Sequence, residues 1–165
     1  CALPICMSEM LQRFAPHADE AVQLAVRAQH ICRWRVPRSD YPLTRDGYFQ
    51  WRTGLYQMHA ELAGDLMHQA GVDEATVTRA KTAIAKRRIK ANPDSQLLED
   101  VAGLVFIEHY LSGFAASKPD YDEAKWIDII QKTWQKMSPA AHQFALSGAL
   151  RLPEPYVPLI QRAIG

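Results

Sequence analysis

Apolar residues recur at helical spacing along most of the chain, and prolines and glycines divide this pattern into segments with little room for strands. The pattern predicts helices over residues 8–14, 18–34, 45–70, 74–88, 94–116, 122–137 and 139–146. Two segments that contain prolines interrupt it, 36–42 and 152–158, and the second leads into a final helical turn or two. The sequence therefore predicts an all-α fold.

Several predicted helix ends carry the residues that such ends prefer. Gly71 suits the C-terminal end of one helix, and Asp73 suits the N-cap of the next. Ser138 followed by Pro139 is typical of a helix start. The helix over 94–116 is apolar around much of its circumference, so we expect it to be central to a compact multi-helix bundle.

Length and charge narrow the class of protein. A chain of 165 residues can bury one substantial core, and it carries no repeat or linker, which favours a single helical domain. Its 19 basic and 18 acidic residues nearly cancel, so no global field favours nucleic acid or an anionic membrane. No signal peptide and no apolar run of about 18 residues is present, which predicts a cytoplasmic protein without a membrane partner.

The first six residues do not fit the rest of the chain. They read CALPIC, interrupt the helical pattern that begins at Met7, and are similar to the translation of a common sequencing adapter. We expect residues 1–6 to be an artefactual leader, residues 7–165 to be the helical domain, and a natural N-terminal segment to be missing. Cys32 would then be the native cysteine, which removes any argument from disulfides.

Three polar residues occupy positions where the helical pattern calls for apolar ones. His30 follows Val26 by one turn, His59 lies between apolar turns, and Asp100 is flanked at helical spacing by Leu97 and Leu104. A buried carboxylate without partners costs several kcal/mol, so Asp100 is expected to meet a histidine, a metal or both.

Two interpretations of this cluster stay open. Two histidines and an acid on separate helices suit a divalent metal ion, which would activate a water molecule near neutral pH. In the other interpretation, His30 and His59 are core histidines that hydrogen-bond Asp100 and the main chain.

Arginines and aromatic residues surround the predicted cluster in the sequence. The guanidinium fork matches two phosphate oxygens, so a phosphate-binding role is predicted for four residues, namely Arg33, Arg38, Tyr48 and Arg52. Alternatively, these residues form a solvated rim with Trp34 and Trp51 as core anchors. A second basic run, residues 81–90, is expected to be a solvated helix end more than an RNA or phosphate contact.

The chain resembles one known family over nearly the whole of its own length, and four segments carry the resemblance. They read AQHICRWRVPRSDYP (28–42), WRTGLYQMHAE (51–61), LEDVAGLVFIE (98–108) and KTWQKMSPAA (132–141). The chain is similar to the domain-of-unknown-function family numbered 4202. Some relatives in that family are labelled glutamyl-tRNA synthetase, but this chain has neither the nucleotide-binding sheet nor the HIGH-type signature of such an enzyme.

The order of the three polar residues is also similar to that of the HD-type metal-dependent phosphohydrolases. That resemblance implies an HD-like helical bundle in which His30, His59 and Asp100 hold a divalent metal ion. Where that family has an aspartate after its second histidine, this chain has Ala60, and Glu99 is the residue that would substitute.

Two functions are therefore predicted. The first is a metal-dependent phosphohydrolase that acts on a nucleotide or small phosphorylated compound, with Glu99, Asp100 and Arg52 in catalytic roles. The alternative is a non-catalytic helical module that binds RNA, nucleotide or protein, which Ala60 favours. Serine and cysteine hydrolases are not favoured, because no G-x-S-x-G elbow occurs and Cys32 has no activating pair nearby in the sequence.

Overall fold

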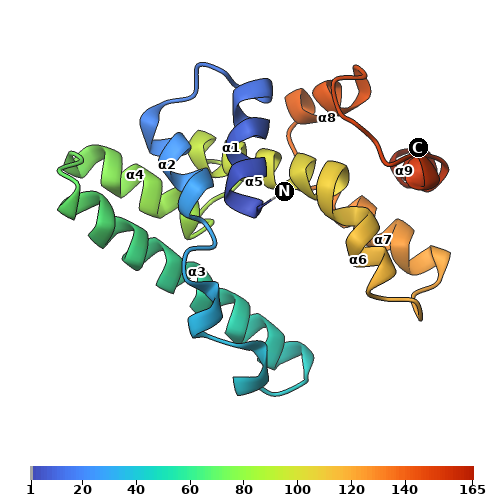
Figure 1. The fold of residues 1–165 in the computed structure, drawn as a ribbon, viewed down its shortest axis with the longest axis horizontal. Helices are drawn as coiled ribbons and strands as arrows, with labels where there is room; N and C mark the ends of the chain where they lie inside the picture. Colours follow the sequence, from blue (N-terminus) through green and yellow to red (C-terminus); the bar gives the residue numbers. More distant parts are fainter. Residues whose placement is uncertain (1) are drawn as a thin grey trace. The chain divides into compact units, whose positions relative to one another are not determined.

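The protein is described by a computed structural model, which covers residues 2–165 and over that range contains helices and no strand (Figure 1). The predicted all-α class is confirmed. The chain divides into two compact units. Unit 2 is the continuous segment His17–Leu98, and unit 1 combines the N-terminal residues up to Pro16 with Glu99–Gly165. The prediction of one domain over 7–165, with HD-like detail, stays a prediction.

Unit 2 is built on three α-helices, with two short 3-10 turns between the first and the second. Its elements are α2 (Glu20–Ala28), η1 (Arg33–Arg35), η2 (Arg38–Asp40), α3 (Arg45–Gln69) and α4 (Glu74–Ile84). Helix α4 packs against both α2 and α3, and Val22, Val26, Val77 and Ile84 are buried in this unit. A Cβ added at Gly64 would lie 2.6 Å from Cδ of Lys81, so a glycine allows α3 to approach α4 closely.

The caps of unit 2 explain where its long helices begin and end. Thr44 Oγ1 accepts a hydrogen bond from the Gly47 N–H at 3.1 Å, and Asp73 Oδ1 accepts one from the Thr76 N–H at 3.0 Å. Helix α3 is followed by Gly71 with a φ of 79°, the glycine that the sequence predicts at this end, in a hydrogen-bond pattern typical of the Schellman motif. Helix α4 ends in the same pattern, but the left-handed position is occupied by Lys86, with a φ of 53°.

Unit 1 contains the remaining helices. Helix α5 begins in the last residues of unit 2, and its later residues belong to unit 1. The elements are α1 (Leu3–Phe14), α5 (Pro93–Val105), the π-helical turn η3 (Phe106–Tyr110), α6 (Leu111–Ala116), α7 (Glu123–Trp134), α8 (Pro139–Leu146), η4 (Glu154–Tyr156) and α9 (Val157–Ile164). Helices α7 and α9 pack together, and the buried residues of this unit include Leu104, Leu111, Ile130 and Ile160.

Several predicted helix bounds were wrong. Helix α4 ends at Ile84, four residues before the predicted end. Helix α1 begins at Leu3 rather than near Ser8, with Pro4 in its first turn, where its missing N–H costs nothing. The predicted helix over 94–116 changes at Phe106 into a π turn, which shifts the helix face by one residue. Helix α2 ends at Ala28, six residues before the predicted end. The expected leader stays a prediction, and Cys1 lies outside the described residues.

Within residues 2–165, no helix combines the length and the apolarity that a membrane span requires.

Candidate functional site: a buried histidine pair

His30 and His59 come together inside unit 2. Their rings meet edge to face, with centroids 5.9 Å apart and planes at 78°. His59 lies in the middle of α3 and is 1% exposed, while His30 is half-buried. The two histidines predicted to share a site are therefore adjacent, although 29 positions separate them in the sequence.

The early end of α2 is what places His30. The predicted helix over 18–34 stops at Ala28, and a series of turns follows, in which the Ile31 N–H bonds the Ala28 carbonyl at 2.9 Å. Cys32 then adopts a left-handed conformation, with a φ of 52°, immediately before η1. His30 thus stands in a turn and not on a helix face, so its position next to α3 depends on this local backbone geometry.

The nitrogen atoms of this pair lack the partners that buried imidazoles usually have. Among the described residues, Nδ1 of His30 and both Nδ1 and Nε2 of His59 are buried without a hydrogen-bond partner. The side-chain nitrogen and oxygen of Gln29, which is also buried, have none either. Buried polar atoms in native structures are usually satisfied, so each of these five atoms needs an explanation.

Burial and nearby cations keep both rings neutral. Burial, reinforced by the charges of Arg33 and Lys86, lowers the pKa of His30 to about 3. Burial and Arg33 lower the pKa of His59 to about 4, against a smaller opposing effect from the main chain of Gln29. At neutral pH the pair therefore offers uncharged imidazole nitrogens, which can accept a proton, a hydrogen bond or a metal ion.

Two of the predicted phosphate-binding arginines lie beside aromatic rings in the same unit. Arg52 donates hydrogen bonds to the hydroxyl of Tyr56 through Nε and to the hydroxyl of Tyr48 through Nη1, the latter at 2.9 Å. Burial by itself would lower the pKa of Arg52, but the contacts with the two tyrosines outweigh it and raise the pKa above its ordinary value. The Arg33 guanidinium lies 5.0 Å from the centre of the Trp51 ring. Over residues 2–165, neither arginine forms an ion pair with a carboxylate, so their charges remain available to an anion.

Arg38 has a different local role from the other arginines. Its guanidinium donates to the carbonyl oxygens of Tyr41 at 2.9 Å and Pro42 at 2.8 Å, and so it organises the loop before α3. It also lies 6.0 Å from the Trp51 ring. Its predicted contact with substrate stays a prediction, and it would have to share donors that the loop already uses.

The structure places Asp100 and Glu99 in unit 1, whereas both histidines belong to unit 2. Both acidic residues are buried, as the sequence pattern predicts for Asp100. The Asp100 carboxylate accepts hydrogen bonds from the main-chain N–H of Ser138 at 2.7 Å and from its hydroxyl at 2.6 Å. Within the part of the chain that is described, no group of three or more His, Cys, Asp and Glu side chains is placed to hold a metal ion.

Sequence reasoning missed two contributors to the site. Tyr56 links two cations, since the Arg52 guanidinium lies 5.5 Å and Lys86 Nζ 5.6 Å from its ring centre. Lys86 belongs to the basic run that the sequence predicts to be solvated, but it is half-buried. The spacing of Arg52 and Tyr56, four residues apart on one helix, could have identified the tyrosine. Nothing in the sequence indicates the left-handed turn that brings Lys86 back toward α3.

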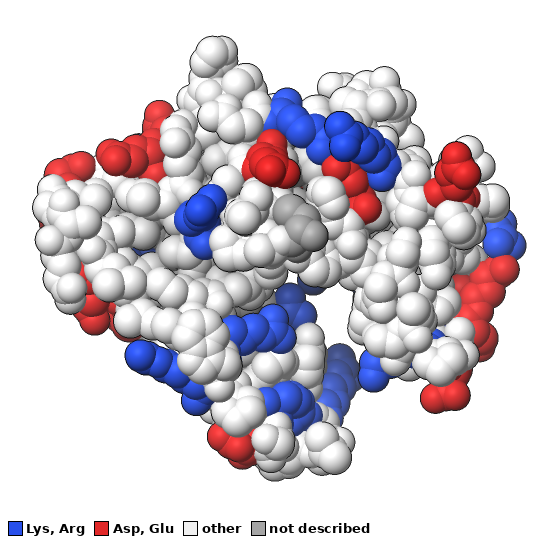
Figure 2. Space-filling view, viewed as in Figure 1, with Lys and Arg blue, Asp and Glu red and all other residues white. Residues whose placement is uncertain are grey.

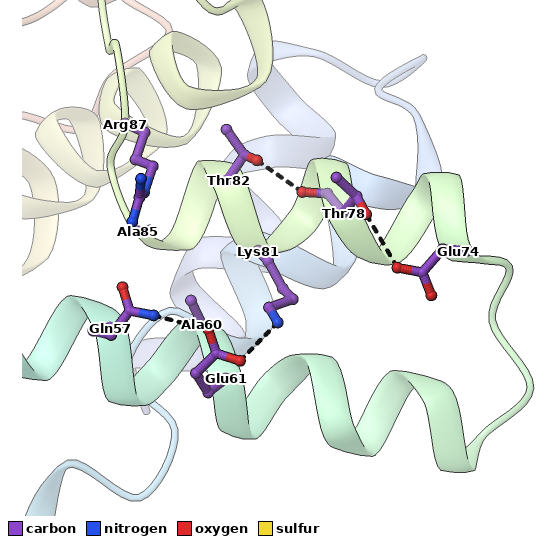
Figure 3. Close-up of a pocket in the computed structure, with 9 residues that line it drawn as sticks. All are labelled: Gln57, Ala60, Glu61, Glu74, Thr78, Lys81, Thr82, Ala85 and Arg87. Atoms are coloured by element: carbon purple, nitrogen blue, oxygen red, sulfur yellow. Dashed lines mark hydrogen bonds and ion pairs between the residues drawn. The ribbon is translucent and has the colours of Figure 1, made fainter.

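A separate open groove of about 290 Å³ lies between α3 and α4 (Figure 3). Its polar side chains bond one another: Glu61 accepts from Gln57 at 2.8 Å and from Lys81 at 2.7 Å. The Thr78 hydroxyl likewise donates to Glu74 at 3.3 Å. Glu61, Lys81 and Glu74 therefore already bond other side chains of the groove, in contrast to the unbonded nitrogens of the histidine pair.

The sequence of the chain matches one known protein family. A family model described as "Domain of unknown function (DUF4202)" matches residues 4–160. No curated protein and no solved structure matches the chain.

Proposed function

Because the chain belongs to the family described as a domain of unknown function, DUF4202, we propose its function from the site itself: the metal-assisted hydrolysis of a small phosphorylated compound, such as a nucleotide, at the histidine pair of unit 2. His30 and His59 would hold the metal ion, and Arg33 and Arg52 would bind the phosphate. The observation that carries the proposal is the set of buried imidazole nitrogens without hydrogen-bond partners.

The state of the two rings supports metal binding. A histidine binds a metal ion through a neutral imidazole nitrogen, and the lowered pKa values keep both rings neutral over the whole physiological range. Leaving such nitrogens buried and unbonded costs about 1–3 kcal/mol for each group. A metal ion bound through one nitrogen of each ring would remove that cost for two of the three atoms.

Neutral imidazole nitrogens are suitable ligands for a divalent cation, and the structure brings two such side chains together, His30 and His59. Catalytic zinc sites usually have three protein ligands and one open position, so with two histidines the remaining positions would be filled by water and by the phosphate of the ligand. That Asp100 or Glu99 adds a further ligand stays a prediction from the sequence. When bound, a divalent cation supplies Lewis acidity toward the phosphate and toward water.

The two arginines support the phosphate half of the proposal. A guanidinium can donate two parallel hydrogen bonds to two phosphate oxygens. Arg52 is held in one orientation by the hydroxyls of Tyr48 and Tyr56, and Arg33 rests on the Trp51 ring. Both charges also act on His30, whose pKa they help to lower. A dianionic phosphate at this position would offset the mutual repulsion of these cations.

Two measurements test the proposal. Isothermal titration with Mn²⁺, Zn²⁺ and Co²⁺ should give a bound ion in the wild-type chain and none in a His30→Leu/His59→Leu double variant, and His17→Gln is the control at an exposed histidine. Hydrolysis of p-nitrophenyl phosphate and of a panel of nucleotides should then depend on the ion that binds. Arg52→Gln should leave metal binding intact while raising KM for the phosphate ester at least tenfold. Absence of binding for all three ions would overturn the metal assignment.

A second candidate is the non-catalytic binding module, and the hydrogen bonds between Asp100 and Ser138 favour it. They give the buried carboxylate a structural role, which a metal ligand would not need. In that case the chain would bind a phosphorylated ligand through Arg33 and Arg52 without turnover and without dependence on a metal. A cytoplasmic location, as predicted from the sequence, is part of either proposal.

A further inference from the structure

Arginines and aromatic rings form a continuous strip along the N-terminal half of α3 and the loop before it. Its members are Arg33, Arg38, Arg45, Tyr48, Phe49, Trp51 and Arg52, all of them in unit 2. We call them the arginine–aromatic strip. Figure 2 shows Lys and Arg side chains gathered over this region, at the lower edge of the view where Figure 1 places the start of α3.

The rings of the strip contact one another in sequence. Tyr48 lies in the middle, with its ring centre 5.9 Å from that of Phe49 on one side and 5.9 Å from that of Trp51 on the other. Each ring also has a guanidinium beside it: Arg45 lies 5.6 Å from Phe49, Arg52 lies 5.9 Å from Tyr48, and Arg33 lies 5.0 Å from Trp51. The strip therefore alternates flat apolar surfaces with fixed positive charges.

Much of this aromatic surface is exposed, which folding stability does not explain. Phe49 is 50% exposed and Tyr48 is 39% exposed, while Trp34, the neighbour of Arg33 in η1, is 77% exposed. Trp51 is the buried member of the group, and its Nε1 donates to the carbonyl of Val36 at 2.9 Å. Exposed aromatic side chains that adjoin one another are typical of a binding surface.

The charge of this segment differs from that of the chain as a whole. Residues 33–52 carry five arginines and two aspartates, whereas the whole chain has a formal net charge of +1. Arg35 and Arg45, which are exposed, form no ion pair with any described residue. An extended anionic partner is therefore favoured at this surface in particular.

We propose that the arginine–aromatic strip, together with Trp34 and Arg35 of η1, binds single-stranded nucleic acid. Proteins that bind single strands combine a basic path for the phosphates with aromatic side chains on which the bases stack. The exposed rings of Trp34, Tyr48 and Phe49 supply the stacking surfaces, and the arginines beside them supply the phosphate contacts. An acidic protein would use the charges but would not require the exposed rings. A duplex would hide its bases from them.

The strip also leads toward the histidine pair. Arg45, Phe49, Arg52, Tyr56 and His59 are three or four residues apart and so share one side of α3, over about 21 Å. If the proposed hydrolysis is correct, on which this one step depends, a strand bound on the strip would run toward the histidine pair. The binding itself does not require the hydrolysis.

The test is fluorescence anisotropy of labelled twelve-nucleotide oligo(U) and oligo(dT) titrated with the full chain. Trp34→Ala and Phe49→Ala should each weaken binding at least fivefold, in proportion to the loss of one stacked base. Arg35→Gln and Arg45→Gln should each weaken it and reduce the slope of log K against log salt by about 0.7. The controls lie in unit 1: Leu146→Ala, at an exposed apolar residue, and Arg151→Gln, at an exposed arginine, should leave both values unchanged.

The outcomes separate this inference from the proposed function. The inference would be overturned if heparin bound as tightly as the oligonucleotides and if the arginine variants, but not the aromatic variants, weakened binding. That result would show a general polyanion surface. Absence of binding at 50 mM salt would also overturn it, whether or not phosphate esters are hydrolysed. Conversely, binding that the His30→Leu/His59→Leu variant retains would support the inference even if no hydrolysis is found.

Discussion

The rings of His30 and His59 meet edge to face with their centroids 5.9 Å apart, and three of their nitrogen atoms are buried without a hydrogen-bond partner. A pair with this geometry is stable only if both rings stay neutral, because two imidazolium ions at this distance, beside Arg33, would repel one another. The lowered pKa values agree with this requirement. The pair therefore links the chemistry of the site to the stability of the fold.

The first prediction concerns pH. The folded chain does not protonate the pair until pH falls to about 4 or 3, whereas an unfolded histidine takes up a proton near pH 6.5. Below pH 6.5 the unfolded state therefore binds more protons, and the free energy of unfolding decreases as pH falls. Between pH 7.5 and 5.5 we expect a loss of about 1 kcal/mol for each of the two histidines.

Urea denaturation at the two pH values, followed by circular dichroism, measures this loss. A His59→Leu variant should lose about half as much stability over the same interval as the wild-type chain does. His17→Gln, at an exposed histidine, should keep the wild-type dependence on pH. A pH profile that His59→Leu leaves unchanged would contradict the proposed neutral state of the pair.

The second prediction uses the same variant at neutral pH. Because both ring nitrogens of His59 lack partners, replacing the ring by an apolar side chain removes a desolvation cost and creates no unsatisfied atom. His59→Leu should therefore raise the free energy of unfolding of the metal-free chain by about 1 kcal/mol. Thermal shift assays should show that the same variant no longer gains stability from added metal ion. A stability loss of several kcal/mol would instead identify His59 as a hydrogen-bonded core residue.

The third prediction concerns backbone strain after α4. Arg88 has a φ of 52°, is exposed, and its side chain forms no interaction with any described residue. A left-handed conformation costs a non-glycine residue about 1–2 kcal/mol, and glycine avoids that cost at some loss of chain entropy. Arg88→Gly should therefore raise the free energy of unfolding by about 1 kcal/mol. The converse change, Gly71→Ala at a φ of 79°, should lower it by a similar amount.

The same backbone positions show where sequence reasoning succeeds and where it fails. Helices α3 and α4 end in the same hydrogen-bond pattern, but only the first end carries a glycine, and only that end was predicted. Thr44 and Asp73 are ordinary caps that a sequence displays directly. Lys86 and Cys32 adopt left-handed conformations that their residue types disfavour, so the turns at these positions could not be derived from local preference.

The residues of the candidate site also differ in how far the sequence predicts their positions. His59 could be predicted, because it interrupts an apolar stripe on a long helix, and the structure buries it. His30 was selected for its helical spacing from Val26, yet it stands in the turn after α2, so it reaches His59 for a reason that the spacing did not contain. Asp100 was expected to need a partner, and the structure supplies Ser138, a residue that the pattern showed only as a helix cap.

The fourth prediction tests that partnership. The Ser138 hydroxyl donates to Asp100 and also accepts, at 3.3 Å, from the Ala141 N–H as the N-cap of α8. Ser138→Ala removes both bonds and should lower the free energy of unfolding by about 2–3 kcal/mol. Asp73→Ala, which removes an N-cap at an exposed position, should cost less than Ser138→Ala does. Equal losses in the two variants would show that Asp100 does not depend on the Ser138 hydroxyl.

The last prediction concerns Glu108, which lies in the π turn η3 and whose side chain is 3% exposed. Arg13 of α1 donates to both of its oxygens, at 2.7 and 3.1 Å, and the Arg151 N–H donates at 3.0 Å. Burial alone would raise the pKa of Glu108, but these hydrogen bonds outweigh it and hold the pKa below its ordinary value. The ion pair should therefore stabilise the fold above pH 4.5 and lose its effect as pH falls further.

A double-mutant cycle measures the coupling energy between Glu108 and Arg13, and an exposed ion pair serves as the comparison. Glu108→Gln should cost about 2 kcal/mol and Arg13→Met a similar amount, less than for a fully buried pair because Arg13 is partly in water. The double variant should cost much less than both together, since neither change then leaves a charge unpaired. Glu123→Gln, whose partner Arg162 lies on the surface, should cost less than 1 kcal/mol. If the losses at Glu108 and Arg13 simply add, the two side chains act independently, and the bidentate contact contributes no coupling to the stability of unit 1.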